Sequence, residues 1–125
     1  CTQIPLITYL RNHKILPIAY SSLAPCSGWR IEEGQSSAKS EKHNNQKSIL
    51  DAICSKHSVS QAQVLLRWAL QKGYPILPKS SKLERVESNA QLFHFEIDEE
   101  DMAKLDGLDE DAALAWPIGN PLKWE

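Results

Sequence analysis

The stretch PILPKSSKLERVESN, residues 75–89, places a short apolar run directly before a lysine and two serines. The run has the length of a strand, and a helical pattern that carries an arginine in its first turn begins soon after it. The free N–H groups at the start of a helix favour an anion, and a cation beside them adds to the attraction. The pattern therefore indicates an anion-binding site formed by Lys79, Ser80, Ser81 and Arg85.

A simpler interpretation gives these residues no ligand. Ser81 then only caps the helix, and Lys79, Lys82 and Arg85 are solvated, since charge near a helix start is common on protein surfaces. In parallel α/β folds, however, ligands bind at the C-terminal ends of strands, which is where Lys79 stands. The residues by themselves leave both interpretations open.

The composition is that of an ordinary globular protein. The chain has 125 residues, of which 42% are apolar and 24% are charged, and its net charge is −2. This length suits one modest domain, and this charge gives no global basic field that would attract nucleic acid or anionic lipid. No apolar run approaches the roughly 20 residues of a membrane span, and the first residues lack the pattern of a signal peptide.

The chain begins with Cys1, and its one methionine is Met102, so we expect it to be a piece of a longer protein. Cys1, Cys26 and Cys54 are odd in number and widely spaced, and the histidines are scattered. This spacing predicts reduced thiols and a cytoplasmic protein, and it gives no support to a metal site.

Two helices are predicted in the first half of the chain. Thr2 is suited to cap a helix that carries Pro5 in its first turn and ends at residues 12–13. Residues 27–47 are polar and are expected to form a long exposed loop. A second helix is expected from about Ser48, with an apolar side made of Ile49, Leu50, Ile53 and Cys54.

The clearest helix is SQAQVLLRWALQKG, residues 60–73. Ser60 and Gln63 have the spacing of a capping box, and Gly73 suits the left-handed residue after a helix.

Two more helices are predicted towards the end of the chain. Ser81 and Glu84 repeat the capping-box spacing. IDEEDMAKLDGL, residues 97–108, has Asp98 as a cap, acids in its first turn and Gly107 at its end. Residues 110–125 show no period and are expected to lie over a surface.

Two apolar runs between these helices have the length of strands: ILPIAY at residues 15–20 and PILP at residues 75–78. Pro17 is unusual in a central strand because it lacks an N–H. Long helical connections imply that the strands pair in parallel, and two strands cannot close a barrel. The predicted fold class is therefore α/β, a parallel sheet whose other strands lie outside this chain.

Residues 61–108, QAQVLLRWALQKGYPILPKSSKLERVESNAQLFHFEIDEEDMAKLDGL, closely resemble the C-terminal part of the aldo-keto reductases. That family's pattern runs Q-V-L-L-R-W, a Gly, I-P-K-S, an Arg and an Asn, then F-x-F and an acidic helix. ILPIAYSSLAP, residues 15–25, resembles its A-Y-S-P-L-G segment. The resemblance implies that residues 1–125 are the C-terminal part of a single (β/α)8 TIM barrel domain, with residues 27–47 as a polar loop and residues 110–125 as a C-terminal loop.

The resemblance also implies a site for the cofactor NADPH/NADP+. In the family, the Lys and Ser of I-P-K-S and the nearby Arg hold the 2′-phosphate of adenosine, and the Asn contacts adenine. These roles fall on Lys79, Ser80, Arg85 and Asn89, with Ser81 beside them.

The A-Y-S-x-L segment carries the other half of this site. The resemblance implies that Tyr20 stacks on nicotinamide and that Ser21 and Leu23 lie along the pyrophosphate. The chain departs from the family at Ser88, where a Glu is common, and at residues 24–25, where Ala-Pro replaces a turn that contains glycine.

The function implied is NADPH-dependent reduction of aldehydes and ketones to alcohols. The family's catalytic Asp, Tyr, Lys and His come from earlier strands, and their motifs are not found in these residues. We therefore name no catalytic residue, and we expect residues 1–125 alone to lack reductase activity. The expected partners are a small carbonyl substrate and the remainder of the barrel, with no nucleic acid and no membrane.

Two alternatives stay open. The first is a non-catalytic NADP-binding barrel that acts as a regulatory or protein-binding module, with residues 27–47 as its contact surface. The second is a half-barrel that pairs with a second copy of the chain, so that two open edges satisfy one another.

Overall fold

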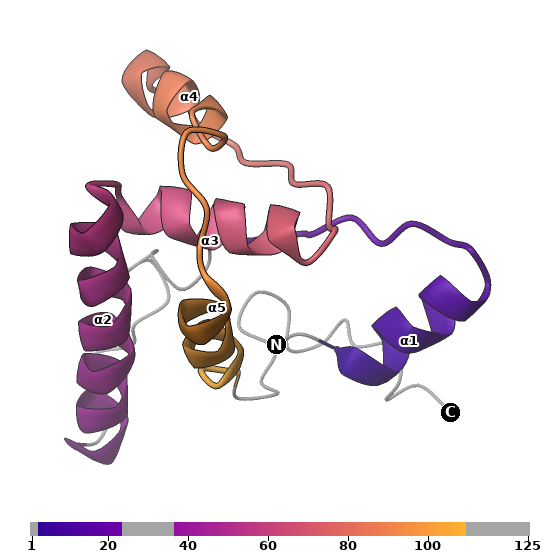
Figure 1. Ribbon diagram of the computed structural model, residues 1–125, viewed down its shortest axis with the longest axis horizontal. Coiled ribbons are helices and arrows are strands. Elements are labelled where there is room, and N and C mark those ends of the chain that lie inside the picture. Colours follow the sequence, from indigo (N-terminus) through magenta and orange to yellow (C-terminus); the bar gives the residue numbers. More distant parts are fainter. Residues whose placement is uncertain (1–2, 24–36, 110–125) are drawn as a thin grey trace.

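The computed structural model describes residues 3–23 and 37–109, and five α-helices lie in these residues. In Figure 1, α2 and α3 meet at a corner, α5 lies inside that corner, α4 lies on the other side of α3, and α1 stands apart from α2. The helices span Ile4–Asn12 (α1), Ser37–His57 (α2), Gln61–Gln71 (α3), Leu83–Ala90 (α4) and Glu99–Asp106 (α5).

The hydrophobic core fills the corner between α2, α3 and α5. Ile53 of α2 and Val64 of α3 are 2% and 0% exposed. The expected apolar side of the second helix is confirmed, because Ile49 and Cys54 pack against this core. The buried members of the cluster are Leu50, Ile53, Val64, Phe95, Ile97 and Leu105.

A reciprocal capping box begins α3, as predicted. The Oγ of Ser60 accepts a hydrogen bond from the Gln63 N–H at 3.2 Å, and the Oε1 of Gln63 accepts one from the Ser60 N–H at 3.0 Å. The Nε2 of Gln63 donates to the carbonyl of Gln91 at 3.0 Å. The same side chain therefore connects the start of α3 to the segment that follows α4. Gly73, after α3, has a φ of 80°, which confirms the predicted left-handed residue.

Ion pairs connect α2 to the start of α5. Asp98 caps α5, since its Oδ1 accepts a hydrogen bond from the Asp101 N–H at 2.9 Å. Lys56, near the end of α2, pairs with the carboxylates of Asp98 and Asp101. Lys104 pairs with Asp101 and with Glu100, each at 2.9 Å. The buried carboxylate of Asp101 is thus held by two lysines from different helices.

The N-terminal helix is attached to the C-terminal end of α3 by one arginine. The guanidinium of Arg11 donates to the Lys72 carbonyl at 2.7 Å and lies over the ring of Tyr74, 5.3 Å from its centroid. The helix itself begins one residue later than expected, because its N-cap is Gln3. Thr2, the predicted cap, lies outside the described residues.

The predicted capping box of Ser81 and Glu84 is wrong. The N-cap of α4 is Lys82, and its side chain makes no capping hydrogen bond. The Oγ of Ser80 accepts a hydrogen bond from the Lys82 N–H at 3.1 Å. This local bond holds the chain in a turn as far as Lys82, so the helix begins only at Leu83.

The predicted loop over residues 27–47 is wrong for residues 37–47, which form the first half of α2. Straight-chain residues such as Lys, Glu and Gln lose little freedom in a helix, and the packed second half of α2 supports its continuation. Residues 27–36 and 110–125 lie outside the described residues.

The two predicted strands do not form as strands in the described residues. The segments meet at one isolated parallel bridge between Ala19 and Ile76, where the Ala19 N–H donates to the Pro75 carbonyl at 2.8 Å. The parallel direction was predicted. A central strand needs a neighbour on each side, and Pro17 lacks an N–H to pair, so the bridge does not extend into a ladder. Leu77, just after the bridge, remains 71% exposed.

Candidate functional site

The predicted anion site lies where the segment after α3 enters α4. Lys79 and Ser81 are exposed there, and Ser80 is half-buried. Besides accepting from the Lys82 N–H, the Oγ of Ser80 donates to the Lys82 carbonyl at 3.3 Å. This pair of bonds closes a tight turn and fixes the direction in which the chain enters α4.

The cations of this region are not neutralised by nearby carboxylates. Lys79, Lys82 and Arg85 are exposed, and none of them forms an ion pair with another residue that the structure describes. The N-cap of α4 offers no side-chain acceptor, so the first N–H groups of the helix remain available to a ligand. Lys56, Lys72 and Lys104, in contrast, each form ion pairs with carboxylates.

The second half of the predicted site follows the other strand-like segment. Tyr20 is 72% exposed and presents a flat aromatic surface. Ser21 has a φ of 55°, in the left-handed region, so the chain turns directly after Tyr20. Leu23 is half-buried, and the Oγ of Ser22 is buried without a hydrogen-bond partner.

The bridge between Ala19 and Ile76 brings these two halves to one end of the molecule. Both segments run in the same direction from the bridge. Tyr20 follows Ala19 directly, and Lys79 comes three residues after Ile76. The aromatic half and the cationic half therefore both lie on the C-terminal side of the bridge, where ligands bind in parallel α/β folds.

Asn89, the predicted adenine contact, lies one helical turn after Arg85 and is its neighbour along α4. It is half-buried. With Val86 and Phe93 it lines a hollow of about 380 Å³ between α4 and the segment at residues 76–78.

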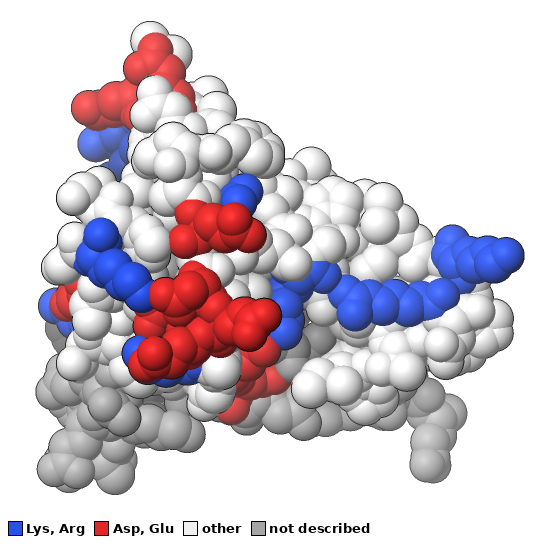
Figure 2. All heavy atoms as spheres, in the orientation of Figure 1, with Lys and Arg blue, Asp and Glu red and all other residues white. Residues whose placement is uncertain are grey.

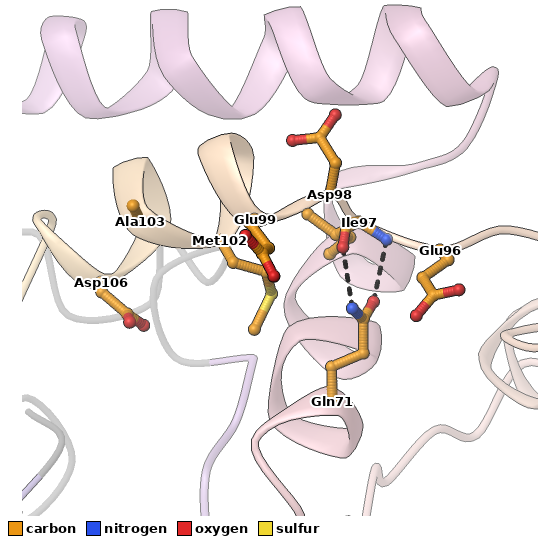
Figure 3. A pocket seen from close by; sticks show the side chains of 8 residues that line it. All are labelled: Gln71, Glu96, Ile97, Asp98, Glu99, Met102, Ala103 and Asp106. Carbon is orange, nitrogen blue, oxygen red and sulfur yellow. Dashed lines mark hydrogen bonds between the residues drawn. The ribbon is translucent and has the colours of Figure 1, made fainter.

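A larger hollow lies on another face and has the wrong charge for a phosphate. It measures about 650 Å³ and lies between the end of α3 and α5. Figure 3 shows carboxylates of Glu96, Glu99 and Asp106 around it, and Figure 2 shows acidic side chains gathered on this side of the molecule. Asp106 is already bound, since it accepts from Trp68 Nε1 at 2.9 Å and pairs with Lys72 at 2.6 Å.

Two other kinds of feature are absent from residues 3–23 and 37–109. No three His, Cys, Asp or Glu side chains gather there in a way that could hold a metal ion. Nor does any helix in these ranges have both the length and the apolar character that crossing a membrane requires.

The sequence misplaces one residue of this region. The capping box predicted at Ser81 would put Lys82 in the first turn of the helix, but Lys82 is the N-cap of α4, where it adds an exposed cation.

The class of protein follows from comparison with known families. The family model described as "Aldo/keto reductase family" matches residues 2–110. The chain belongs to the aldo/keto reductase family, and the resemblance seen in its sequence is confirmed.

Particular relatives are named as reductases or oxidoreductases of fungi and bacteria. The chain is 38% identical over 123 residues to the NAD(P)H-dependent D-xylose reductase of Scheffersomyces stipitis, covering 98% of this chain and 37% of that protein. It is 37% identical over 123 residues to an uncharacterized oxidoreductase of Schizosaccharomyces pombe, covering 98% of this chain and 39% of that protein. A stretch of 63 residues is 49% identical to the glyoxal reductase of Bacillus subtilis, covering 50% of this chain and 23% of that protein. The chain thus spans less than half the length of these relatives.

Solved aldo-keto reductases share the arrangement of the chain. The Bombyx mori enzyme, solved in complex with NADP, matches with a TM-score of 0.69 and 25% identity, covering 90% of this chain and 35% of that one. The enzyme of Brucella melitensis matches with a TM-score of 0.65 and 28% identity, covering 86% and 35%. These neighbours are (β/α)8 barrels. The predicted relation to such a barrel is confirmed, although the two expected strands are reduced to one bridge.

Proposed function

We propose that this chain forms the cofactor-binding part of an NADPH-dependent carbonyl reductase that converts aldehydes or ketones to alcohols. Family membership supports the proposal, as do a relative named as an NAD(P)H-dependent reductase and a neighbour solved with NADP. The observation that carries it is the set of unpaired cations, Lys79, Lys82 and Arg85, around the start of α4.

The arrangement suits the 2′-phosphate that distinguishes NADPH from NADH. Lys79 supplies a compact charge, and Arg85 supplies a planar guanidinium that can hold two phosphate oxygens at once. Ser81 adds an exposed hydroxyl, and the first N–H groups of α4, at the positive end of the helix dipole, would favour an anion. No residue of this set is needed by the core, so its unpaired charges remain available to a ligand.

The remaining residues would orient the reactive end of the cofactor. The exposed ring of Tyr20 would stack on nicotinamide, and the turn at Ser21 would direct Leu23 along the pyrophosphate. Bound NADPH supplies the hydride that reduces a carbonyl carbon. We place the proton donor and its partners outside residues 1–125, and we place the enzyme in the cytoplasm, in keeping with cysteines that lack disulfide spacing.

The test is Lys79→Met in the protein at its full expressed length, with NADPH and NADH binding followed by fluorescence titration. Loss of one charge-assisted contact, about 1.5–3 kcal/mol, should weaken NADPH binding about 10- to 100-fold. NADH binding should change by less than about twofold, since it has no 2′-phosphate for the missing charge to contact. Lys47→Met, at an exposed lysine of α2, is the matched control and should change neither.

Equal losses for both cofactors, or no loss for NADPH, would contradict the phosphate site. The proposal that the proton donor lies outside residues 1–125 has its own test. Purified residues 1–125 should not oxidise NADPH in the presence of an aldehyde, and turnover by that preparation would show that this chain holds its own proton donor.

A further inference from the structure

Ser80 and Ser81 stand side by side before α4, and their hydroxyls have different surroundings. The Oγ of Ser80 is held by two local hydrogen bonds, since it accepts from the Lys82 N–H at 3.1 Å and donates to the Lys82 carbonyl at 3.3 Å. Ser80 is half-buried, whereas Ser81 is exposed and its hydroxyl makes no hydrogen bond to the residues that the structure describes. Of the two hydroxyls, that of Ser81 is therefore the one that an enzyme from outside can reach.

The segment around Ser81 is open to such an enzyme. Residues 77–82 lie between α3 and α4, outside any helix, and all of them except Ser80 are exposed. Lys79 stands two residues before Ser81 and Lys82 one residue after it, and neither forms an ion pair with another described residue. Modifying enzymes act on exposed segments of this kind, and unpaired cations beside a serine complement an acidic substrate cleft.

We propose that Ser81 is a phosphorylation site and that its phosphorylation weakens the binding of NADPH. The inference rests on the proposed function and adds a means of regulating that same site. In a serine kinase that prefers basic substrates, the Ser81 Oγ attacks the γ-phosphorus of ATP. The bond from that phosphorus to the bridging oxygen breaks, ADP leaves with the electron pair, and the hydroxyl proton passes to the base of the kinase.

The new phosphate competes with that of the cofactor. It carries a charge of about −1.5 to −2 and three acceptor oxygens. Lys79, Lys82 and Arg85 have no carboxylate partners among the described residues, so a phosphate on Ser81 pairs with the same cations that the 2′-phosphate of NADPH needs. Because it is attached to the chain, it competes at a high effective concentration. NADH has no 2′-phosphate and therefore loses little.

Peptide mass spectrometry tests the site itself. The protein at its full expressed length is incubated with Mg-ATP and, in separate samples, with the catalytic domains of protein kinases A and C, which prefer basic substrates. Phosphate should appear on Ser81 and not on the bonded Ser80. Ser58 is the matched control, because it is exposed and follows Lys56 by two residues, but Lys56 is already paired with two carboxylates. Labelling of Ser81 by neither kinase, or equal labelling of Ser58, would overturn the proposal.

Fluorescence titration with the two cofactors tests the consequence. The phosphorylated protein should bind NADPH at least about tenfold more weakly than the untreated protein, whereas NADH binding should change by less than about twofold. Ser81→Ala, compared before and after the same kinase treatment, should show no loss of NADPH affinity.

The failure of this proposal can be told apart from the failure of the proposed function. Phosphate on Ser81 that leaves NADPH affinity unchanged, or a loss that persists in treated Ser81→Ala, would overturn the regulation and leave the cofactor site intact. An untreated protein that binds neither dinucleotide would overturn the proposed function, and with it the regulation.

Discussion

The side-chain amide of Gln71 pairs with both backbone groups of Ile97. Its Nε2 donates to the Ile97 carbonyl at 2.8 Å, and its Oε1 accepts from the Ile97 N–H at 2.9 Å (Figure 3). These are the two hydrogen bonds that a neighbouring β-strand would make to one residue of an extended segment. It thereby fixes, against the end of α3, the segment that places Phe95 and Ile97 in the core.

Gln71→Leu should destabilise the protein by at least about 2 kcal/mol, because two backbone groups of buried Ile97 lose their partners at about 1–3 kcal/mol each. The free energy of unfolding from urea denaturation measures the loss. Gln61→Leu is the control, since the bond from Gln61 to Asp51 is exposed, and it should cost less than about 0.5 kcal/mol. Similar losses in the two variants would mean that the Gln71 pair contributes nothing special.

The two predicted capping boxes give opposite expectations for serine replacement. Ser60→Ala should cost about 1 kcal/mol, because Ser60 caps α3. Ser81→Ala should cost less than about 0.5 kcal/mol without ligand, because α4 begins after Lys82. Unfolding measurements on the two variants without cofactor decide this. A loss at Ser81 as large as that at Ser60 would restore the capping box that the structure removes.

Acid should weaken the connection between α2 and α5. Hydrogen bonds from Lys56 lower the pKa of Asp98 and Asp101 below their usual 3.8, with Lys104 adding to the effect on Asp101. A carboxyl with a lowered folded pKa stabilises the protein above its usual pKa and loses that contribution as pH falls through the folded value. The ionised carboxylates therefore stabilise the folded protein fully at neutral pH, and this contribution to the free energy of unfolding is lost below about pH 4.

The pKa of Lys56 is raised by its bonds to Asp101 and Asp98, so its contribution persists below pH 10.5 and is lost only above it. Lys56→Met should be less stable than the unmodified protein at pH 7, and the difference should shrink as the pH is lowered. Urea denaturation at several pH values measures it. A difference that stays constant down to about pH 2.5 would show that the ion pairs do not contribute.

Gly73 and Gly107 should respond differently to alanine. Gly73 has a φ of 80°, and an added Cβ would meet nothing within 4 Å, so Gly73→Ala carries only the backbone penalty of about 1 kcal/mol. Gly107 has a φ of −66°, and its Cβ would lie 3.4 Å from the Lys104 carbonyl. Gly107→Ala should therefore be nearly neutral. Equal costs in thermal unfolding would show that the left-handed conformation is not what matters at Gly73.

Local chemistry explains which elements the sequence could predict. The starts of α3 and α5 were predicted because Ser60 and Asp98 bond to the backbone N–H three positions away. The same spacing failed at Ser81 because Ser80 forms a shorter-range bond to Lys82. The strands were predicted from apolar runs, but a strand exists only with neighbours, and the segments meet through a single bridge.

The candidate site was likewise predicted only in part. Lys79, Ser80 and Arg85 could be found from the sequence because their types and order carry the family pattern. That the cations lack carboxylate partners, and that the Ser22 hydroxyl is buried and unbonded, depends on how distant segments pack. Spacing along the chain cannot reveal a missing partner.

Both the oxygen and the nitrogen of the Gln63 amide form hydrogen bonds, and this restricts which residues can replace Gln63. Glutamate closes an ordinary capping box as well as glutamine does. Here the amide nitrogen also donates a hydrogen bond to the Gln91 carbonyl. A carboxylate in its place would put an oxygen against that carbonyl oxygen, and the two acceptors would repel each other. Gln63→Glu would keep the capping box of α3 and lose the hydrogen bond to Gln91, in the segment that follows α4. Homologues that retain both contacts should therefore keep the amide.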